Sequence, residues 1–305
     1  MANLDLEAIH AWVDEQWESH VLPSLSDFIE IPALSPAFDE DWAANGYLDD
    51  TIDLFLGWLT SLPMKGMSCN VHRLEGRTPV LTITIEGTGE GEVLFYSHLD
   101  KQPPVTGWSE GKGPWLPVRE DPWLYGRGSV DDGYGGYLSV LSILALQQHG
   151  IPHPKATYLI ETCEESGSFD LPAYLDELSD TLGTPDLVVV MDSGAGDYER
   201  LWVTTSLRGL VGGTLKVGVC EEGVHSGMAG GIIPSSFRIA RSIISRIEDE
   251  STGKFYFVTS GNGNGLSVLQ LLDAQKLQQW KNGSDKQGRF GYGYGVLRSV
   301  FSKNT

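Results

Sequence analysis

Three apolar stretches of the sequence each end abruptly in acidic or imidazole side chains. These runs and the polar residues that follow them are 93–96 with His98 and Asp100, 157–160 with Glu164 and Glu165, and 187–191 with Asp192. Short, continuous apolar runs are typical of strands that are buried on both faces of a sheet. In open α/β sheets, ligand sites form outside the carboxyl ends of the strands. The pattern therefore predicts an α/β fold with a polar site at one edge of its sheet.

Helical patterns surround these predicted strands. The segment 137–146 is apolar almost all round, as expected for a helix buried against a sheet. Segments 5–20 and 46–62 carry apolar residues at helical spacing. Segments 69–74 and 79–85 alternate between apolar and polar residues, which favours two further strands.

Composition limits the classes of protein that fit this chain. It has 305 residues, 41% hydrophobic and 20% charged, which is typical of a soluble globular protein large enough for two domains. The net charge of −20 makes nucleic acid and anionic membranes poor partners. The acidity serves solubility or, in a sharper interpretation, gathers carboxylates around cations. Its three cysteines lack Cys-x-x-Cys spacing, and the sequence has no transmembrane or signal-peptide pattern, so the cytoplasm is the expected location.

The pattern changes after residue 201. Segments 202–205 and 213–219 have the composition of strands from a different sheet, and Pro234 opens a helix with an apolar face. We therefore predict a first domain over 1–205 and a second over 206–254. The remaining stretch, 255–305, is a divergent tail without a clear motif.

The polar residues at the strand ends favour metal chemistry. His98, Asp131, Glu165 and Asp192 offer nitrogen and oxygen ligands, a set that suits Zn²⁺, Mn²⁺ or Co²⁺. One carboxylate can bridge two cations about 3.5–4 Å apart, which can then share a water and lower its pKa.

Hydrolysis at such a site also needs an acid that is not a ligand, to accept the proton of the water. Adjacent carboxylates at 164 and 165 can divide these two tasks, and Asp100 can accept the second N–H of the His98 imidazole. Taken singly, a His near a strand end or a Glu-Glu pair is ordinary, and Asp131 with Asp132 can cap the following helix. Taken together at successive strand ends, they favour a metal site.

These motifs resemble the dinuclear-zinc exopeptidase and deacylase family. The family includes cytosolic dipeptidases and carnosinases, glutamate carboxypeptidase, acetylornithine deacetylase and succinyl-diaminopimelate desuccinylase. The resemblance covers roughly residues 22–248, and its specific parts are Ser97-His98-Leu99-Asp100, Gly107-Trp108, 124–132, 164–168, Asp192 and His225-Ser226-Gly227.

The resemblance implies a three-layer catalytic domain with a mostly parallel mixed sheet, and an α/β sandwich lid that serves dimerisation. It implies two Zn²⁺ ions, with Mn²⁺ or Co²⁺ as alternatives, and hydrolysis of peptide or N-acyl amino-acid amide bonds. The implied roles are His98 and Asp192 on one metal, Glu165 on the other, Asp131 as the bridge, Glu164 as general base, Asp100 as the orienting acid, and His225 of the lid polarising the substrate carbonyl.

Two departures from the family pattern affect this interpretation. The family commonly has Lys two residues after the bridging Asp, where this chain has Gly133 followed by Tyr134. No His follows the lid to supply the last metal ligand, so the chain is expected to be a truncated member. Two functions therefore stay open: a metal-dependent hydrolase, or a catalytically weak relative that binds metal or dimerises without turnover.

Overall fold

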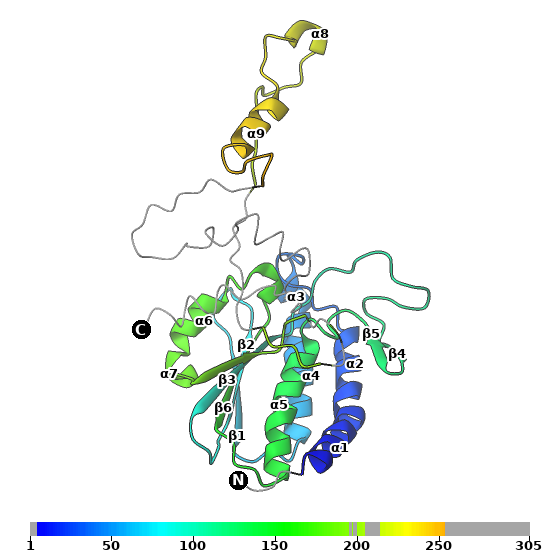
Figure 1. Cartoon of the computed structure of the whole chain (residues 1–305), viewed down its shortest axis with the longest axis vertical. Helices are drawn as coiled ribbons and strands as arrows, with labels where there is room; N and C mark the ends of the chain where they lie inside the picture. The colour runs from blue at the N-terminus through cyan, green and yellow to red at the C-terminus, as the bar shows by residue number, and fades with distance from the viewer. Residues whose placement is uncertain (1–4, 195–196, 198–199, 205–213, 254–305) are drawn as a thin grey trace. The chain divides into compact units, whose positions relative to one another are not determined.

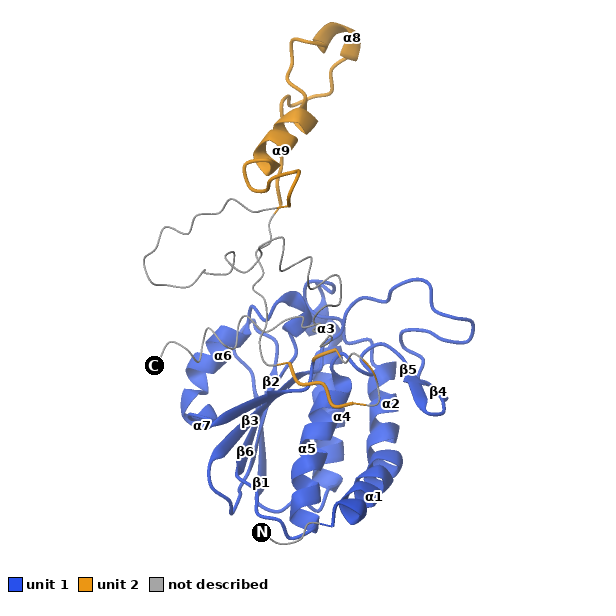
Figure 2. Cartoon of the chain, in the orientation of Figure 1, with its two compact units in different colours: residues 1–192 blue, residues 193–305 orange. Residues whose placement is uncertain are grey.

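The computed structural model describes residues 5–194, 197, 200–204 and 214–253. The chain separates into two compact units, Met1–Asp192 and Ser193–Thr305, shown in blue and orange in Figure 2. Each unit is described by itself.

The first unit is built on a mixed sheet of five strands. In spatial order these are β1 (Met67–His72), β2 (Val80–Ile85), β6 (Lys155–Glu161), β3 (Glu92–His98) and β7 (Leu187–Val190). β3 pairs in parallel with both β6 and β7, whereas β2 runs antiparallel to both β1 and β6. The expected α/β fold is thus present, although only the β6-β3-β7 half of the sheet is parallel. A separate hairpin joins β4 (Val118–Glu120) to β5 (Trp123–Tyr125).

Helices lie on either side of the sheet in Figure 1. One group consists of α1 (Leu6–Gln16), a π-helical turn (Trp17–Val21), α2 (Leu22–Glu30), α4 (Tyr47–Ser61) and α5 (Gly133–Gln148). The short α3 (Trp42–Asn45) precedes α4, and α6 (Leu171–Glu177) and α7 (Ser179–Leu182) lie between β6 and β7 in the sequence. α6 and α7 meet at Leu178, which is the C-cap of the first and the N-cap of the second.

The core explains why the sequence of α5 is apolar on every side. This helix contacts β3 as well as α1 and α2, so it has no broad solvent face. Tyr137 of α5 meets the rings of Phe55 and Trp58 of α4 edge to face, at centroid distances of 4.8 and 4.6 Å. Phe95 of β3 stacks on Tyr158 of β6 at 4.8 Å. These contacts fix α5 against α4, and β3 against β6.

The second unit corrects part of the sequence prediction. Its described helices are α8 (Ser226–Ala229) and α9 (Ser236–Ile244), the latter capped by the Ser235 hydroxyl close to the expected start after Pro234. The described residues 202–204 and 214–219 lie outside strands, contrary to the expectation for these segments. A strand persists only where a partner completes its hydrogen bonds, and local composition cannot supply that partner.

The predicted domain ranges 1–205 and 206–254 and the sandwich architecture of the lid stay predictions. The tail predicted for 255–305 lies outside the described residues.

Candidate metal centre

The parallel strands deliver the predicted site residues to one edge of the sheet. In the register of the sheet, Tyr96 of β3 lies beside Leu159 of β6 and Val190 of β7. His98 is the last residue of β3, and Asp192 follows the end of β7. Glu164 and Glu165 form a 3₁₀ turn just after β6. The carboxyl ends of the three strands therefore place these side chains together, as the sequence predicted.

His98 is the centre of the resulting cluster. Its Nε2 atom lies 3.3 Å from an oxygen of Asp131, 3.6 Å from one of Asp192 and 3.9 Å from one of Glu164. Two overlapping groups have their potential ligand atoms within 4.8 Å of one another: His98 with Asp131 and Glu165, and His98 with Glu164 and Asp192. The described residues thus bring together all four predicted ligands and the predicted base.

Asp100 links two parts of the cluster through its buried carboxylate. Its fully buried carboxylate accepts the backbone N–H groups of Glu164 at 3.1 Å and Glu165 at 3.0 Å. The same carboxylate lies 3.4 Å from Nδ1 of His98, which also lies 3.1 Å from the Asp100 carbonyl oxygen. When Nδ1–H donates to Asp100, Nε2 is the nitrogen that remains for a metal. Asp100 therefore connects the end of β3 to the turn after β6.

Asp132 holds the opposite side of His98. Its buried carboxylate accepts the backbone N–H of His98 at 3.3 Å, while the neighbouring Asp131 side chain faces the imidazole and is 47% exposed. The peptide bond between the two aspartates is cis. Asp132 stands at the N-cap position of α5 but makes no capping side-chain hydrogen bond. Helix capping therefore does not account for this pair.

The donor set fits a divalent metal. Nε2 of His98 and Oε1 of Glu165 are buried and have no hydrogen-bond partner among the described residues. Buried polar atoms are normally satisfied, so two such atoms beside converging carboxylates point to a cation as their partner. Imidazole nitrogen and carboxylate oxygen are ordinary ligands of Zn²⁺ and Mn²⁺. The residues that would hold it are His98, Asp131, Glu165 and Asp192, and Glu164 lies beside them.

The protonation of these groups reflects their crowding. Burial, together with the neighbouring carboxylates and against the attraction of His98, raises the pKa of Glu164 to about 8. Burial and Asp131 raise the pKa of Glu165 to about 7. The pKa of Asp131 is instead lowered, because the His98 imidazole favours its charged form. Burial opposes a charge on His98, but its carboxylate neighbours outweigh that effect and raise its pKa well above the usual value.

Several supporting residues escaped the sequence analysis. Gln102 donates a hydrogen bond to Glu165, and buried Glu161 accepts from Tyr96 at 2.6 Å and from Ser168 at 2.8 Å. The apolar run of β6 identifies Glu161 only as the residue at which the strand ends. Its role depends on tertiary contacts.

Lys101 is the least expected of these residues. It is fully buried, and its Nζ donates to the carbonyl oxygens of Phe28 at 2.5 Å and Ile31 at 2.7 Å, at the end of α2. The ammonium also lies 3.9 Å from the centre of the Phe28 ring. A lysine directly after the Asp100 motif gave no signal that it would cap a distant helix.

His225, the predicted lid residue, belongs to the second unit. It is exposed there, and its Nδ1 accepts the backbone N–H of Gly227 at 3.1 Å at the start of α8. Its role toward a substrate carbonyl stays a prediction.

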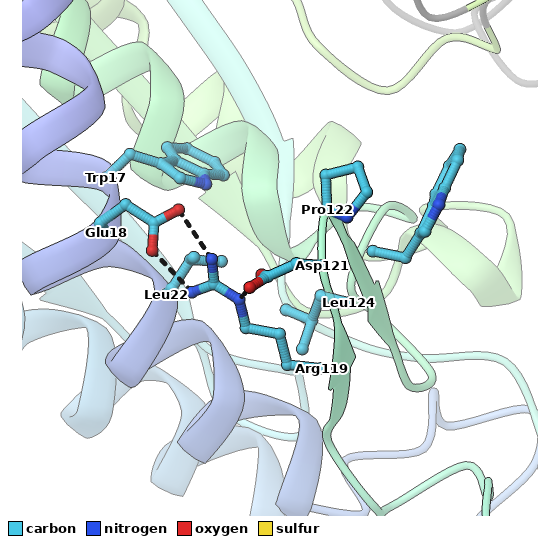
Figure 3. Close-up of a pocket in the computed structure, with 8 residues that line it drawn as sticks. Trp17, Glu18, Leu22, Arg119, Asp121, Pro122 and Leu124 are labelled. Carbon is cyan, nitrogen blue, oxygen red and sulfur yellow. Dashed lines mark hydrogen bonds and ion pairs between the residues drawn. The ribbon is translucent and has the colours of Figure 1, made fainter.

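A cavity of about 270 Å³ lies elsewhere on the first unit (Figure 3). Arg119 crosses it and pairs with both carboxylate oxygens of Glu18, at 2.6 and 2.9 Å, and with Asp121 at 2.5 Å. The charges that line the cavity therefore satisfy one another, and they indicate a contact between the N-terminal helices and the β4–β5 hairpin. The lining residues are Trp17, Glu18, Leu22, Arg119, Asp121, Pro122, Trp123 and Leu124.

Comparison with known proteins agrees with this geometry. The model of Peptidase family M20/M25/M40 matches residues 94–250, which are more than half of the chain and contain the whole cluster. The chain belongs to this family.

Individual relatives are distant. The chain is 27% identical over 168 residues to "Probable di- and tripeptidase DUG2" of Saccharomyces cerevisiae, an alignment that covers 54% of this chain and 19% of the relative. It is 27% identical over 209 residues to "Cysteinylglycine-S-conjugate dipeptidase" of Corynebacterium striatum, covering 66% and 45%. The matched part thus spans less than half the length of either relative.

The fold is shared with a solved structure. Human carnosine dipeptidase 1 superposes with a TM-score of 0.57 at 18% identity, covering 98% of this chain and 61% of that one. Among the described residues, no helix combines the length and apolar character that crossing a bilayer requires.

Proposed function

We propose that the chain is a metal-dependent hydrolase of dipeptides or N-acyl amino acids, acting on the amide bond. The observation that carries the proposal is the convergence of one imidazole and four carboxylates at the carboxyl edge of three parallel strands. The names of the matched relatives, a di- and tripeptidase and a dipeptidase, support small peptides as the substrate class.

In this proposal, the cluster holds two divalent cations, Zn²⁺ in the first instance, with Mn²⁺ or Co²⁺ as alternatives. His98 and Asp192 would hold one ion, Glu165 would hold the other, and Asp131 would contribute to both. When bound, the ions supply Lewis acidity, which lowers the pKa of water and stabilises negative charge on the substrate oxygen. Asp100 fixes the His98 ring and the Glu164–Glu165 turn through the contacts described above.

Glu164 is the proposed general base. Its carboxylate lies at the edge of the cluster, 3.9 Å from Nε2 of His98, where it can accept a proton from a nearby water. It accepts a proton from the attacking water and passes it to the amide nitrogen that leaves. The family resemblance also implies a homodimer through the second unit and a role for His225. Both remain part of the proposal.

The experiment combines metal analysis with a substrate screen. Metal-depleted protein is titrated with Zn²⁺, Mn²⁺ or Co²⁺ and assayed on a panel of dipeptides and N-acyl amino acids. Asp131→Asn should lose metal and hydrolysis, whereas Asp121→Asn, which removes an exposed carboxylate beside Arg119, should retain both. Stoichiometric metal without hydrolysis of any panel member would favour the alternative function, a metal-binding relative without turnover. Absence of metal binding would refute the hydrolase and the metal-binding alternative, and would leave only a relative that dimerises.

A further inference from the structure

The three strand ends that form the cluster differ in how well they are enclosed. His98 and Asp100 after β3 are fully buried, and Glu161 at the end of β6 is 1% exposed. β7 is instead an edge strand, whose sheet partner among the described residues is β3. Its first residue, Leu187, is 58% exposed, and the residues up to Asp192 are half-buried. Asp192 therefore extends from the least enclosed of the three ends.

A side chain of α5 holds this end. Tyr134, in the first turn of α5, donates a hydrogen bond from its hydroxyl to the carbonyl oxygen of Met191, the residue directly before Asp192. Burial and the nearby carboxylates of Asp132 and Asp192 raise the pKa of Tyr134 to about 12, so its hydroxyl remains a donor at neutral pH. The bond joins the segment after β7 to the helix that begins at the Asp131–Asp132 pair.

We propose that Tyr134 is a positioning residue that fixes the segment carrying Asp192, and thereby one of the two metal sites. This inference rests on the proposed function for its second part, the metal site. The hydroxyl bonds to the backbone carbonyl of the residue before the proposed ligand. It holds the Met191 carbonyl in place and so limits the positions that Asp192 can take. In the structure, Oδ2 of Asp192 lies 3.6 Å from Nε2 of His98. Groups that orient metal ligands from outside typically change metal affinity 10–100-fold when removed.

The same helix provides a matched control. Tyr137 lies one turn further along α5, and its hydroxyl pairs with the Ser24 hydroxyl at 2.8 Å within the core. Tyr134→Phe and Tyr137→Phe each remove one hydroxyl and one hydrogen bond from α5 and keep the ring. A general loss of packing or stability would appear in both variants, whereas a positioning effect on Asp192 would appear in Tyr134→Phe alone.

The first test is amide hydrogen exchange of the metal-free protein. We expect peptides covering 187–192 to exchange severalfold faster in Tyr134→Phe than in the unaltered protein, and to be unchanged in Tyr137→Phe. This measurement does not depend on metal binding. Unchanged exchange in Tyr134→Phe, or equal acceleration in both variants, would overturn the proposal.

The second test is calorimetric titration with Zn²⁺. We expect Tyr134→Phe to weaken one of two zinc equivalents about tenfold and to leave the other unchanged. Asp192→Asn should weaken the same equivalent more strongly, and Tyr137→Phe neither. Equal weakening of both equivalents, or none, would overturn the assignment of Tyr134 to the Asp192 site. If the unaltered protein binds no zinc, the proposed function fails, and hydrogen exchange alone decides whether Tyr134 anchors the segment.

Discussion

The two sides of the metal centre are held by different means. On the β3–β6 side, the Asp100 carboxylate accepts two backbone N–H groups and contacts the His98 ring, all within the buried interior. On the β7 side, Asp192 follows a half-buried edge strand whose end is tied to α5 through the Tyr134 hydroxyl. Hydrogen bonds to a charged acceptor contribute about 1.5–3 kcal/mol, more than a bond between neutral groups. Among the described residues, the first side is therefore held by buried hydrogen bonds to a carboxylate, and the second by a tyrosine hydroxyl at a half-buried strand end.

This difference suggests a division of labour in metal binding. In the proposed function, the buried groups around His98 would set where the cations are held, and the Tyr134 hydroxyl would hold the Asp192 segment in the position that completes the site.

Replacing His98 should have the largest effect, because this residue belongs to both groups of potential ligands. We expect His98→Ala to weaken zinc binding by more than about 100-fold, since even groups outside the ligand set matter 10–100-fold. Calorimetric titration provides the measurement. His153→Ala is the control, because this histidine lies before β6 and bonds to Gln147 and the Pro154 carbonyl. Retention of one tight equivalent in His98→Ala would contradict its central position.

Substitution of Glu164 tests whether this residue is the general base. Glu164→Gln keeps the size of the side chain and removes its basicity, so metal content should survive while turnover falls at least about 100-fold. The measurements are metal analysis and steady-state hydrolysis on the same preparation. Loss of metal together with activity would instead make Glu164 a ligand, as its place near His98 and Asp192 also allows.

Asp100 tests the connection between β3 and the turn after β6. In Asp100→Asn, one carboxylate oxygen becomes an N–H donor that faces a backbone N–H of Glu164 or Glu165, so one hydrogen bond is replaced by a repulsive contact. We expect zinc affinity to fall about tenfold and the melting temperature to decrease. Asp186→Asn is the control, since Asp186 also accepts a backbone N–H, that of Glu92, but at the far end of β3. Equal effects of the two substitutions would mean that Asp100 serves stability alone.

Much of the cluster could be predicted from the sequence. Short apolar runs are typical of buried parallel strands, and the carboxyl ends of such strands share one edge of the sheet. The sequence therefore predicts that His98, Glu164, Glu165 and Asp192 lie together, as they do in the structure. The supporting contacts were not predictable. Lys101 caps a helix that ends some seventy residues earlier in the chain, and the Tyr134 bond depends on the distance between α5 and the end of β7. Such contacts depend on tertiary packing, which local sequence periodicity does not report.

The second unit shows the same limit more strongly. α9 was expected from Pro234 and its apolar spacing, which are local signals. The strands expected around 202–205 and 213–219 required partners that no local pattern identifies, and the described parts of both segments lie outside strands. Helices depend mainly on neighbours in the sequence, whereas strands depend on distant residues. This explains why the predicted helix is present and the predicted strands are absent from the described residues.

Changing the pH should change zinc affinity gradually, because groups of the cluster gain and lose protons near neutral pH. The raised pKa of Glu165, about 7, means that its carboxyl carries a proton below neutral pH in the metal-free protein. A cation must displace this proton, so zinc affinity should rise as the pH increases. For one group with a pKa near 7, the increase between pH 6 and 8 is about tenfold. The raised pKa of His98 acts in the same direction, whereas Asp131, with its lowered pKa, is already ionised throughout this range.

Titration calorimetry in buffers of different ionisation enthalpy measures the protons released when zinc binds. We expect more protons to be released at pH 6 than at pH 8, because the ligands have already lost part of their protons at the higher pH. Glu165→Gln should remove part of this pH dependence as well as part of the affinity. Asp131→Asn should lower the affinity without removing the proton release that comes from Glu165. A zinc affinity that stays constant between pH 6 and 8 would mean that Glu165 is ionised before the metal binds. Crowding of the carboxyl groups would then not keep the cluster protonated.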